Sequence, residues 1–196
     1  MGISALQIHG TQEFTHNREW QILISCKVDF NQLFDGGKIA KLYCAGVGIF
    51  PVFSGLFPHT NRIGCARYQN GPIPTGKYWI VDRPRGGLRS WLKEQEKHYR
   101  TGNDYSSWFA LYRQDGLIDD SSYIDETLRN SFRLHPLRPD GTGVSDGCVT
   151  FYNQNDFDML RYALMRAHVT DIPIIHQKAY GEIEVLGDMN APCIMV

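Results

Sequence analysis

Short runs rich in β-branched and aromatic residues, separated by glycine, proline and Asp/Asn turns, recur along the whole sequence. The 196 residues include 19 Gly and 9 Pro, and turn signals such as Asp35-Gly36-Gly37 fall between the runs. Runs of this length and composition are typical of strands rather than helices. The sequence therefore predicts a mainly β fold, with strands at residues 20–29, 39–46, 76–82, 108–113, 131–135, 148–152 and 182–186.

Two segments have the spacing of a helix instead. Residues 153–168 begin with an asparagine that can cap the first turn of a helix. At helical spacing, one side of this segment is apolar and consists of Phe157, Leu160, Leu164 and Ala167. The mostly charged segment 88–98 predicts a second, shorter helix. We therefore expect one or two helices beside the sheet.

Length and charge limit the classes of function. Lys plus Arg number 20 and Asp plus Glu number 21, so the chain has no overall positive charge to attract a nucleic acid. The N-terminus lacks a basic and then apolar export signal, and no stretch approaches the roughly 20 apolar residues of a membrane span. We expect one domain over residues 1–196, in which 1–37 form an N-terminal segment of unassigned role. We expect neither a nucleic-acid partner nor membrane insertion.

The five cysteines are an odd number, so at least one thiol stays outside any disulfide. No C-x-x-C pair and no His/Asp/Glu cluster with ligand spacing is present, so we expect no metal and no organic cofactor. Core packing or disulfide bonding is the expected role of four cysteines, Cys26, Cys44, Cys65 and Cys193. Of these, Cys26 and Cys44 lie on predicted strands and can pair in an oxidising compartment.

The densest chemical signal lies at residues 132–151, where His135 ends one predicted strand and Cys148 begins the next. A nucleophilic thiol needs a base that removes its proton, and His135 is the nearest candidate across a loop rich in Gly and Pro. Gly147 permits a close backbone approach, and nearby amides can face a developing oxyanion. Ser145 fits a supporting hydrogen-bond role, because no strand–turn–helix context accompanies its G-x-S-x-G match.

These residues resemble the H…S-x-G-C signature of the L,D-transpeptidase catalytic domain: His135, nine residues, and then Ser145-Asp146-Gly147-Cys148. Further segments in the same order, including those at 48–51, 71–78, 108–113 and 180–181, resemble L,D-transpeptidase-like toxins that type VI secretion systems deliver into the periplasm of competing bacteria. The resemblance covers about residues 38 to 187. It implies a single β-sandwich or barrel domain of the L,D-transpeptidase kind.

The resemblance also implies an activity. Cys148 would attack the diaminopimelate carbonyl of a peptidoglycan tetrapeptide stem and expel the terminal D-alanine, with His135 as base and then acid. Transfer of the thioester to water is L,D-carboxypeptidase activity, and transfer to an amine is L,D-transpeptidase activity or D-amino-acid exchange. The implied partners are peptidoglycan stem peptides, a cognate immunity protein and the type VI secretion apparatus.

Without an export signal, such an effector would be made in the cytoplasm, secreted by that apparatus and active in the periplasm of the target cell.

The sequence departs from the wider family at two positions. Asp146 places a carboxylate beside the nucleophile, where it tends to raise the thiol pKa. Thr150 stands two residues after the cysteine, where the family often has an arginine, so a substrate carboxylate must be bound by another group. The candidates are arginines elsewhere in the chain, namely Arg133, Arg138 and the Arg83/Arg85 pair.

Two other functions fit the residues. A papain-like cell-wall amidase or peptidase would use a histidine that follows the cysteine, either His168 or His176. A non-enzymatic module that binds cell wall or a partner protein would leave Cys148 inert.

Overall fold

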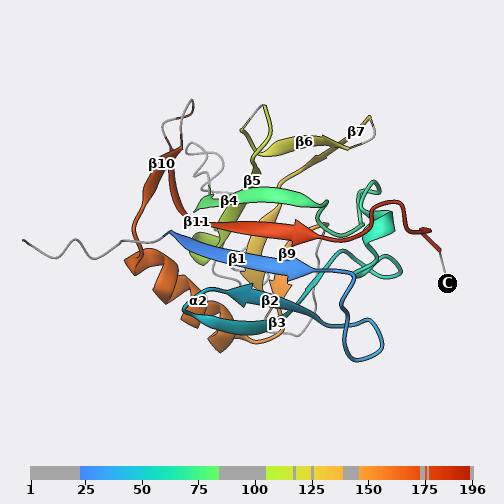
Figure 1. Ribbon diagram of the computed structural model, residues 1–196, viewed down its shortest axis with the longest axis horizontal. Helices are drawn as coiled ribbons and strands as arrows, with labels where there is room; N and C mark the ends of the chain where they lie inside the picture. Colours follow the sequence, from blue (N-terminus) through green and yellow to red (C-terminus); the bar gives the residue numbers. More distant parts are fainter. Residues whose placement is uncertain are drawn as a thin grey trace, which may run out of the picture.

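The computed structural model describes residues 23–83, 105–116, 118–124, 126–138, 146–172, 175 and 177–194. Its main sheet has the strand order β1-β2-β3-β9-β8-β5-β4-β11-β10, and a further pairing joins β1 to β11. This pairing closes eight strands into a barrel (Figure 1). The mainly β prediction is confirmed, and of the two expected architectures, sandwich and barrel, the fold is the barrel. The nine strands of this sheet are β1 (Ile24–Asp29), β2 (Ala40–Cys44), β3 (Gly48–Ser54), β4 (Gly76–Asp82), β5 (Phe109–Arg113), β8 (Arg133–Pro136), β9 (Val149–Phe151), β10 (Thr170–Ile172) and β11 (Gln177–Leu186).

The closing pair β1–β11 and the pair β8–β9 run parallel, whereas the other neighbours in the barrel are antiparallel. Strands β8 and β9 are parallel neighbours, so their starts lie side by side. The residues directly before β9 therefore lie beside the start of β8, and the candidate site lies there.

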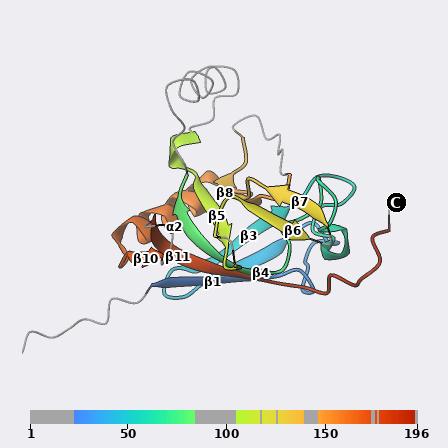
Figure 2. The same ribbon diagram turned by 90° about the horizontal axis from the view of Figure 1, so that it is seen from above.

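The barrel interior is filled by the inward-facing residues of the strands. Alternate residues of β11 are buried, as the period of two in a strand requires. The helix α2 (Gln154–Arg166) adds three side chains to the same apolar core, namely Phe157, Leu160 and Leu164. In both views α2 lies on the opposite side of the barrel from the hairpin of β6 (Ser121–Ile124) and β7 (Thr127–Asn130) (Figure 1, Figure 2).

Helix α2 confirms the helix predicted at 153–168. The side chain of Asn153 accepts a hydrogen bond from the Asn155 N–H at 2.8 Å, as a capping residue does. Ala167, predicted on the apolar face, instead lies just beyond the helix and is half-buried. The second predicted helix, at 88–98, lies outside the described residues. In the described part of the chain, no helix is long and apolar enough to cross a membrane.

The seven predicted strands are present over their described residues, but the structure adds β3, β6, β7 and β10. Strand β3 contains Pro51, which argues against a strand in the middle of a sheet. The proline is tolerated because the pairing of β3 with β9 begins only at Val52, one residue later. The other three added strands have only three or four residues each.

Two disulfides cross-link the fold. Cys26 and Cys44 are bonded across directly paired positions of β1 and β2, as the sequence allowed. Cys65, in the short 3₁₀ helix η1 (Ile63–Cys65), is bonded to Cys193 near the C-terminus. Cys148 is the cysteine that remains outside a disulfide. The N-terminal segment 1–37 has a structural role in its described part, because β1 completes the barrel.

Candidate active site

Cys148 and His135 lie on the same outer face of the barrel wall formed by β8 and β9, and the Cys148 thiol contacts the Ser131 carbonyl oxygen at 3.8 Å. The two strands pair with Leu134 opposite Val149 and His135 opposite Thr150. Leu134 and Val149 belong to the inner core, so their neighbours His135 and Thr150 face outward. Cys148 precedes Thr150 by two residues and therefore lies on the same side. Both candidate residues are buried, with exposed fractions of 3% for His135 and 9% for Cys148.

The imidazole of His135 is oriented by the backbone. Its Nδ1 lies 2.8 Å from the carbonyl oxygen of Pro136, which can only accept, so Nδ1 carries the hydrogen. Nε2 then presents its lone pair and lies 3.3 Å from Thr150 Oγ1. The position at which L,D-transpeptidases often have an arginine thus holds a hydroxyl that contacts the imidazole of His135.

An aromatic stack covers the imidazole. The ring of Trp108 lies parallel to that of His135, with centroids 4.1 Å apart, and Tyr105 packs against Trp108 at 4.6 Å. Arg83 lies over the Tyr105 ring and donates to the Tyr105 carbonyl at 3.2 Å. Trp108 begins a predicted strand, but in the structure it lies directly before β5 and forms a wall of the site.

Burial keeps the imidazole neutral. Loss of solvent lowers the pKa of His135 to about 4, against the opposing effect of the Pro136 carbonyl, and the charges of Arg138 and Arg133 lower it further. The imidazole of His135 is therefore uncharged at neutral pH.

Burial also keeps the thiol protonated, since it raises the pKa of Cys148 to about 11. The backbone N–H and the charge of Arg133 oppose this shift, whereas the carboxylates of Asp146 and Asp120 reinforce it. The effect expected of Asp146 is thus present, and a partly buried arginine counteracts it. The resting pair is a neutral thiol and a neutral imidazole.

The candidate arginines surround this pair. Arg133 forms a bidentate ion pair with Asp120, at 2.5 and 2.6 Å, so a substrate carboxylate would share its guanidinium with Asp120. Arg138 is half-buried, and its charge acts on His135. Arg83 reaches the site through Tyr105 and Trp108. Binding of substrate by these three arginines stays a prediction, and Arg85 lies outside the described residues.

The turn before Cys148 requires glycine at position 147. Gly147 has φ of +98°, and a Cβ there would come within 2.7 Å of the Phe132 ring and collide with the Arg129 guanidinium. Its carbonyl accepts a hydrogen bond from Ser54 Oγ at 3.2 Å, while the same hydroxyl accepts from the Ile73 N–H at 2.8 Å. The peptide group before Cys148 is therefore held in place by the buried Ser54 hydroxyl.

Arg129 is a residue of this region that the sequence did not indicate. It is 1% exposed, and its guanidinium donates to the backbone carbonyls of Ala66, Gly71 and Asp146. A buried guanidinium with backbone acceptors keeps its positive charge next to the Cys148 turn, although burial lowers the pKa of Arg129. It ties the Cys148 turn to the loop that follows η1.

The remaining predicted residues lie elsewhere. Ser145 and His176 are outside the described residues, so the predicted support by Ser145 stays a prediction. His168 is exposed and follows the C-terminal end of α2, whereas His135 lies on the strand that pairs with β9. The local geometry favours His135 as the partner of Cys148.

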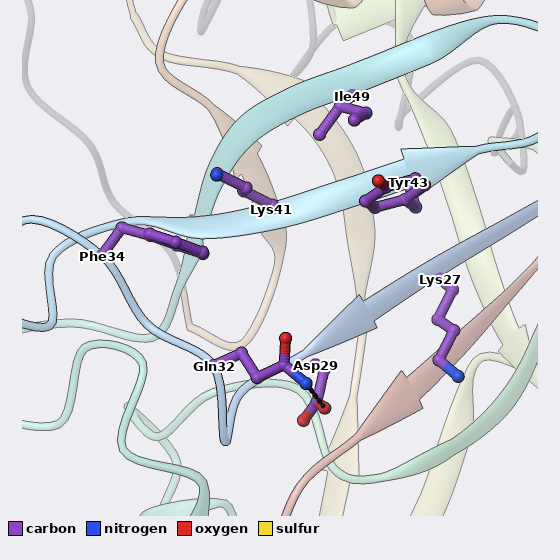
Figure 3. A pocket seen from close by; sticks show the side chains of 7 residues that line it. All are labelled: Lys27, Asp29, Gln32, Phe34, Lys41, Tyr43 and Ile49. Atoms are coloured by element: carbon purple, nitrogen blue, oxygen red, sulfur yellow. Dashed lines mark hydrogen bonds between the residues drawn. The ribbon is translucent and has the colours of Figure 1, made fainter.

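A groove of about 510 Å³ lies on the outside of β1, β2 and β3, and its lining includes none of the candidate site residues (Figure 3). Lys41 lies 3.7 Å above the Phe34 ring, and Gln32 donates to Asp29 at 3.2 Å. The groove is lined by Lys27, Asp29, Gln32, Phe34, Lys41, Tyr43 and Ile49.

Comparison with known proteins identifies the family. The model of the Tlde1 domain matches residues 48–175, about two thirds of the chain, and this span contains His135 and Cys148. No significant match was found among curated proteins or among solved structures. The chain therefore belongs to the Tlde1 domain family, a family of type VI secretion effectors of the peptidoglycan-modifying kind.

Proposed function

We propose that this protein is a cysteine-dependent L,D-acyltransferase that acts on the tetrapeptide stems of peptidoglycan. The observation that carries the proposal is that His135 on β8 and Cys148, directly before β9, share the outer face of this parallel pair, with Nε2 of His135 left as the basic nitrogen. Nucleophilic catalysis by a thiol uses a nearby base of this kind to take the thiol proton.

In the first step, His135 Nε2 takes the proton of the Cys148 thiol as the sulfur attacks the diaminopimelate carbonyl. The resting thiol has a raised pKa, so the proton moves during the attack rather than before it. Arg133 lies close enough to counter the negative charge on sulfur. The imidazolium then gives its proton to the leaving amine, the C–N bond breaks and D-alanine departs.

In the second step, the thioester is attacked by water or by the amine of a D-amino acid. His135 Nε2 removes the proton of the attacking group, and the C–S bond breaks to restore the thiol. Water gives a tripeptide, which is carboxypeptidase activity, and an amine gives transpeptidation or exchange. The burial of His135 and Cys148 limits the access of water to the thioester, so an amine acceptor can compete with water for it.

Recognition of the stem peptide falls to cationic groups near the site. Arg138 and Arg83 are the arginines best placed to bind the terminal carboxylate, because Arg133 is already paired with Asp120. We further propose the cellular setting that fits such an effector: synthesis in the cytoplasm, transfer by the type VI apparatus, action in the target periplasm and neutralisation by an immunity protein.

Purified tetrapeptide muropeptides, incubated with the protein with and without D-methionine and followed by mass spectrometry, test this proposal. We expect a tripeptide product or a D-methionine-capped product, and we expect Cys148→Ala and His135→Ala each to abolish both. A matched control is His168→Ala, an exposed histidine outside the site, which should keep full activity. Cleavage at another bond would indicate an amidase, and an unchanged substrate would indicate a binding module.

A further inference from the structure

A second cluster of chemically reactive side chains lies where the C-terminal tail meets η1. One ring nitrogen of His59 and the sulfurs of Cys65 and Cys193 lie within 4.8 Å of one another. The two sulfurs form a disulfide in the structure. The members are up to 134 positions apart in sequence, so no ligand spacing could indicate the cluster.

His59 of this cluster has the burial and the hydrogen bonding of a metal-binding histidine. It is 5% exposed, and its Nδ1 lies 2.8 Å from the side-chain oxygen of Asn70, so Nδ1 carries the hydrogen. Nε2 is left with its lone pair, and within the described residues it is buried without a hydrogen-bond partner. The ring stacks on Tyr68 at 5.4 Å, which fixes its plane.

An oriented imidazole that lies beside two sulfurs and has a buried, unpartnered nitrogen matches a known ligand chemistry. Thiolates and imidazole are the preferred ligands of Zn²⁺, and metal-bound histidines usually donate their other N–H to an oxygen acceptor. Asn70 supplies that acceptor here. Three protein ligands leave a fourth tetrahedral position for water.

We propose that, when the Cys65–Cys193 disulfide is reduced, the two thiolates and Nε2 of His59 bind one Zn²⁺ ion. A dithiol reductant transfers two electrons and two protons to the disulfide, which becomes two thiols as the reductant closes to its own disulfide. The two thiols lose their protons to solvent on binding, and zinc remains divalent throughout. Oxidation by another disulfide reverses the sequence and releases the ion.

The metal site would keep the C-terminal tail linked to η1 in place of the disulfide. Ala191 of the tail packs so closely on Gly64 of η1 that no side chain would fit there, and Arg62 donates to the Ile194 carbonyl. The disulfide holds these contacts across 128 residues of sequence. Zinc would hold the same tail in a reducing compartment, where the disulfide does not persist. This role is independent of the acyltransferase proposal.

The test uses the full chain with Cys148→Ala, so that this thiol cannot bind metal. The protein is reduced with a phosphine without oxygen and titrated with Co²⁺, and Zn²⁺ then displaces Co²⁺ in competition with a chelator. We expect sulfur-to-cobalt charge-transfer absorption, one ion per chain, and an affinity about 10 to 100-fold lower for Asn70→Ala. Loss of the ligand itself in His59→Gln should weaken binding by at least as much. The double substitution Cys65→Ser/Cys193→Ser should abolish it.

The other disulfide supplies the matched control. Replacing Cys26 and Cys44 by serine also removes two sulfurs, but it should leave the cobalt spectrum and the stoichiometry unchanged. The folding of each variant is first checked by circular dichroism before reduction. The Cys65→Ser/Cys193→Ser variant lacks this disulfide, so it is checked as purified.

Thermal unfolding of the reduced protein is an independent readout. Zn²⁺ should raise the Tm of the reduced parent by more than it raises that of reduced His59→Gln. Zinc binding of equal affinity in His59→Gln, or loss of binding on removal of Cys26 and Cys44, would overturn the proposal.

Discussion

Lowering the pH should destabilise this protein through His135. The pKa of His135 is lowered to about 4 by burial, whereas an unfolded chain has an ordinary histidine pKa of about 6.5. Between these values the unfolded state binds more protons, so stability is full above pH 6.5 and falls as the pH drops toward 4. The two pKa values make the folded state about 2 kcal/mol less stable at pH 5 than at pH 7.

Urea unfolding at pH 7 and pH 5, compared between the parent and His135→Asn, isolates this contribution. Asparagine can still donate to the Pro136 carbonyl but does not titrate, so the variant should lose about 2 kcal/mol less than the parent over the same interval. His168→Asn, at an exposed position, should lose as much as the parent. An equal loss in the parent and His135→Asn would refute the assignment of a buried neutral imidazole.

Three further perturbations address the thiol, its turn and the barrel closure. Iodoacetamide should modify Cys148 more slowly at pH 7 than it modifies an unstructured cysteine peptide, with a rate that rises toward pH 10, because burial raises its pKa; a fast, pH-independent rate would indicate a resting ion pair. Gly147→Ala should lower the free energy of unfolding by more than about 2 kcal/mol, whereas Gly46→Ala, which also has positive φ but open space around it, should lower it by only about 1 to 2 kcal/mol. Equal losses would contradict the steric argument. Replacing Cys26 and Cys44 by serine should cost about 3 kcal/mol for a loop of 18 residues in urea unfolding; no loss would show that the barrel closure does not need this bond.

The sheet was largely predictable because most of its strands are locally encoded. Strand β4 was predicted with its observed bounds, since its run of aromatic and β-branched residues ends at clear turn signals. Strand β3 was missed because Pro51 contradicts a strand locally, and the proline is acceptable only because β9 ends at Phe151, opposite Val52. Closure into a barrel depends on the pairing of β1 with β11, which joins the two ends of the chain and has no local signal.

The two central residues of the site were predictable because a single sequence motif contains both. His135 and Cys148 stand 13 positions apart, and the resemblance to L,D-transpeptidases named both. The groups that define their environment come from distant segments, such as Trp108 over the imidazole. Arg129 was the least predictable, because charged residues are rarely buried and a sequence gives no sign of one bound to backbone carbonyls.

The central claim is that Cys148 forms a thioester with the stem peptide. Incubation with tetrapeptide muropeptide, a rapid acid quench and peptide mapping by mass spectrometry would test it directly. The account predicts an adduct on the Cys148 peptide whose mass equals the substrate without its terminal D-alanine, absent from Cys148→Ala. Release of D-alanine with no such adduct, or an adduct at another residue, would contradict the account.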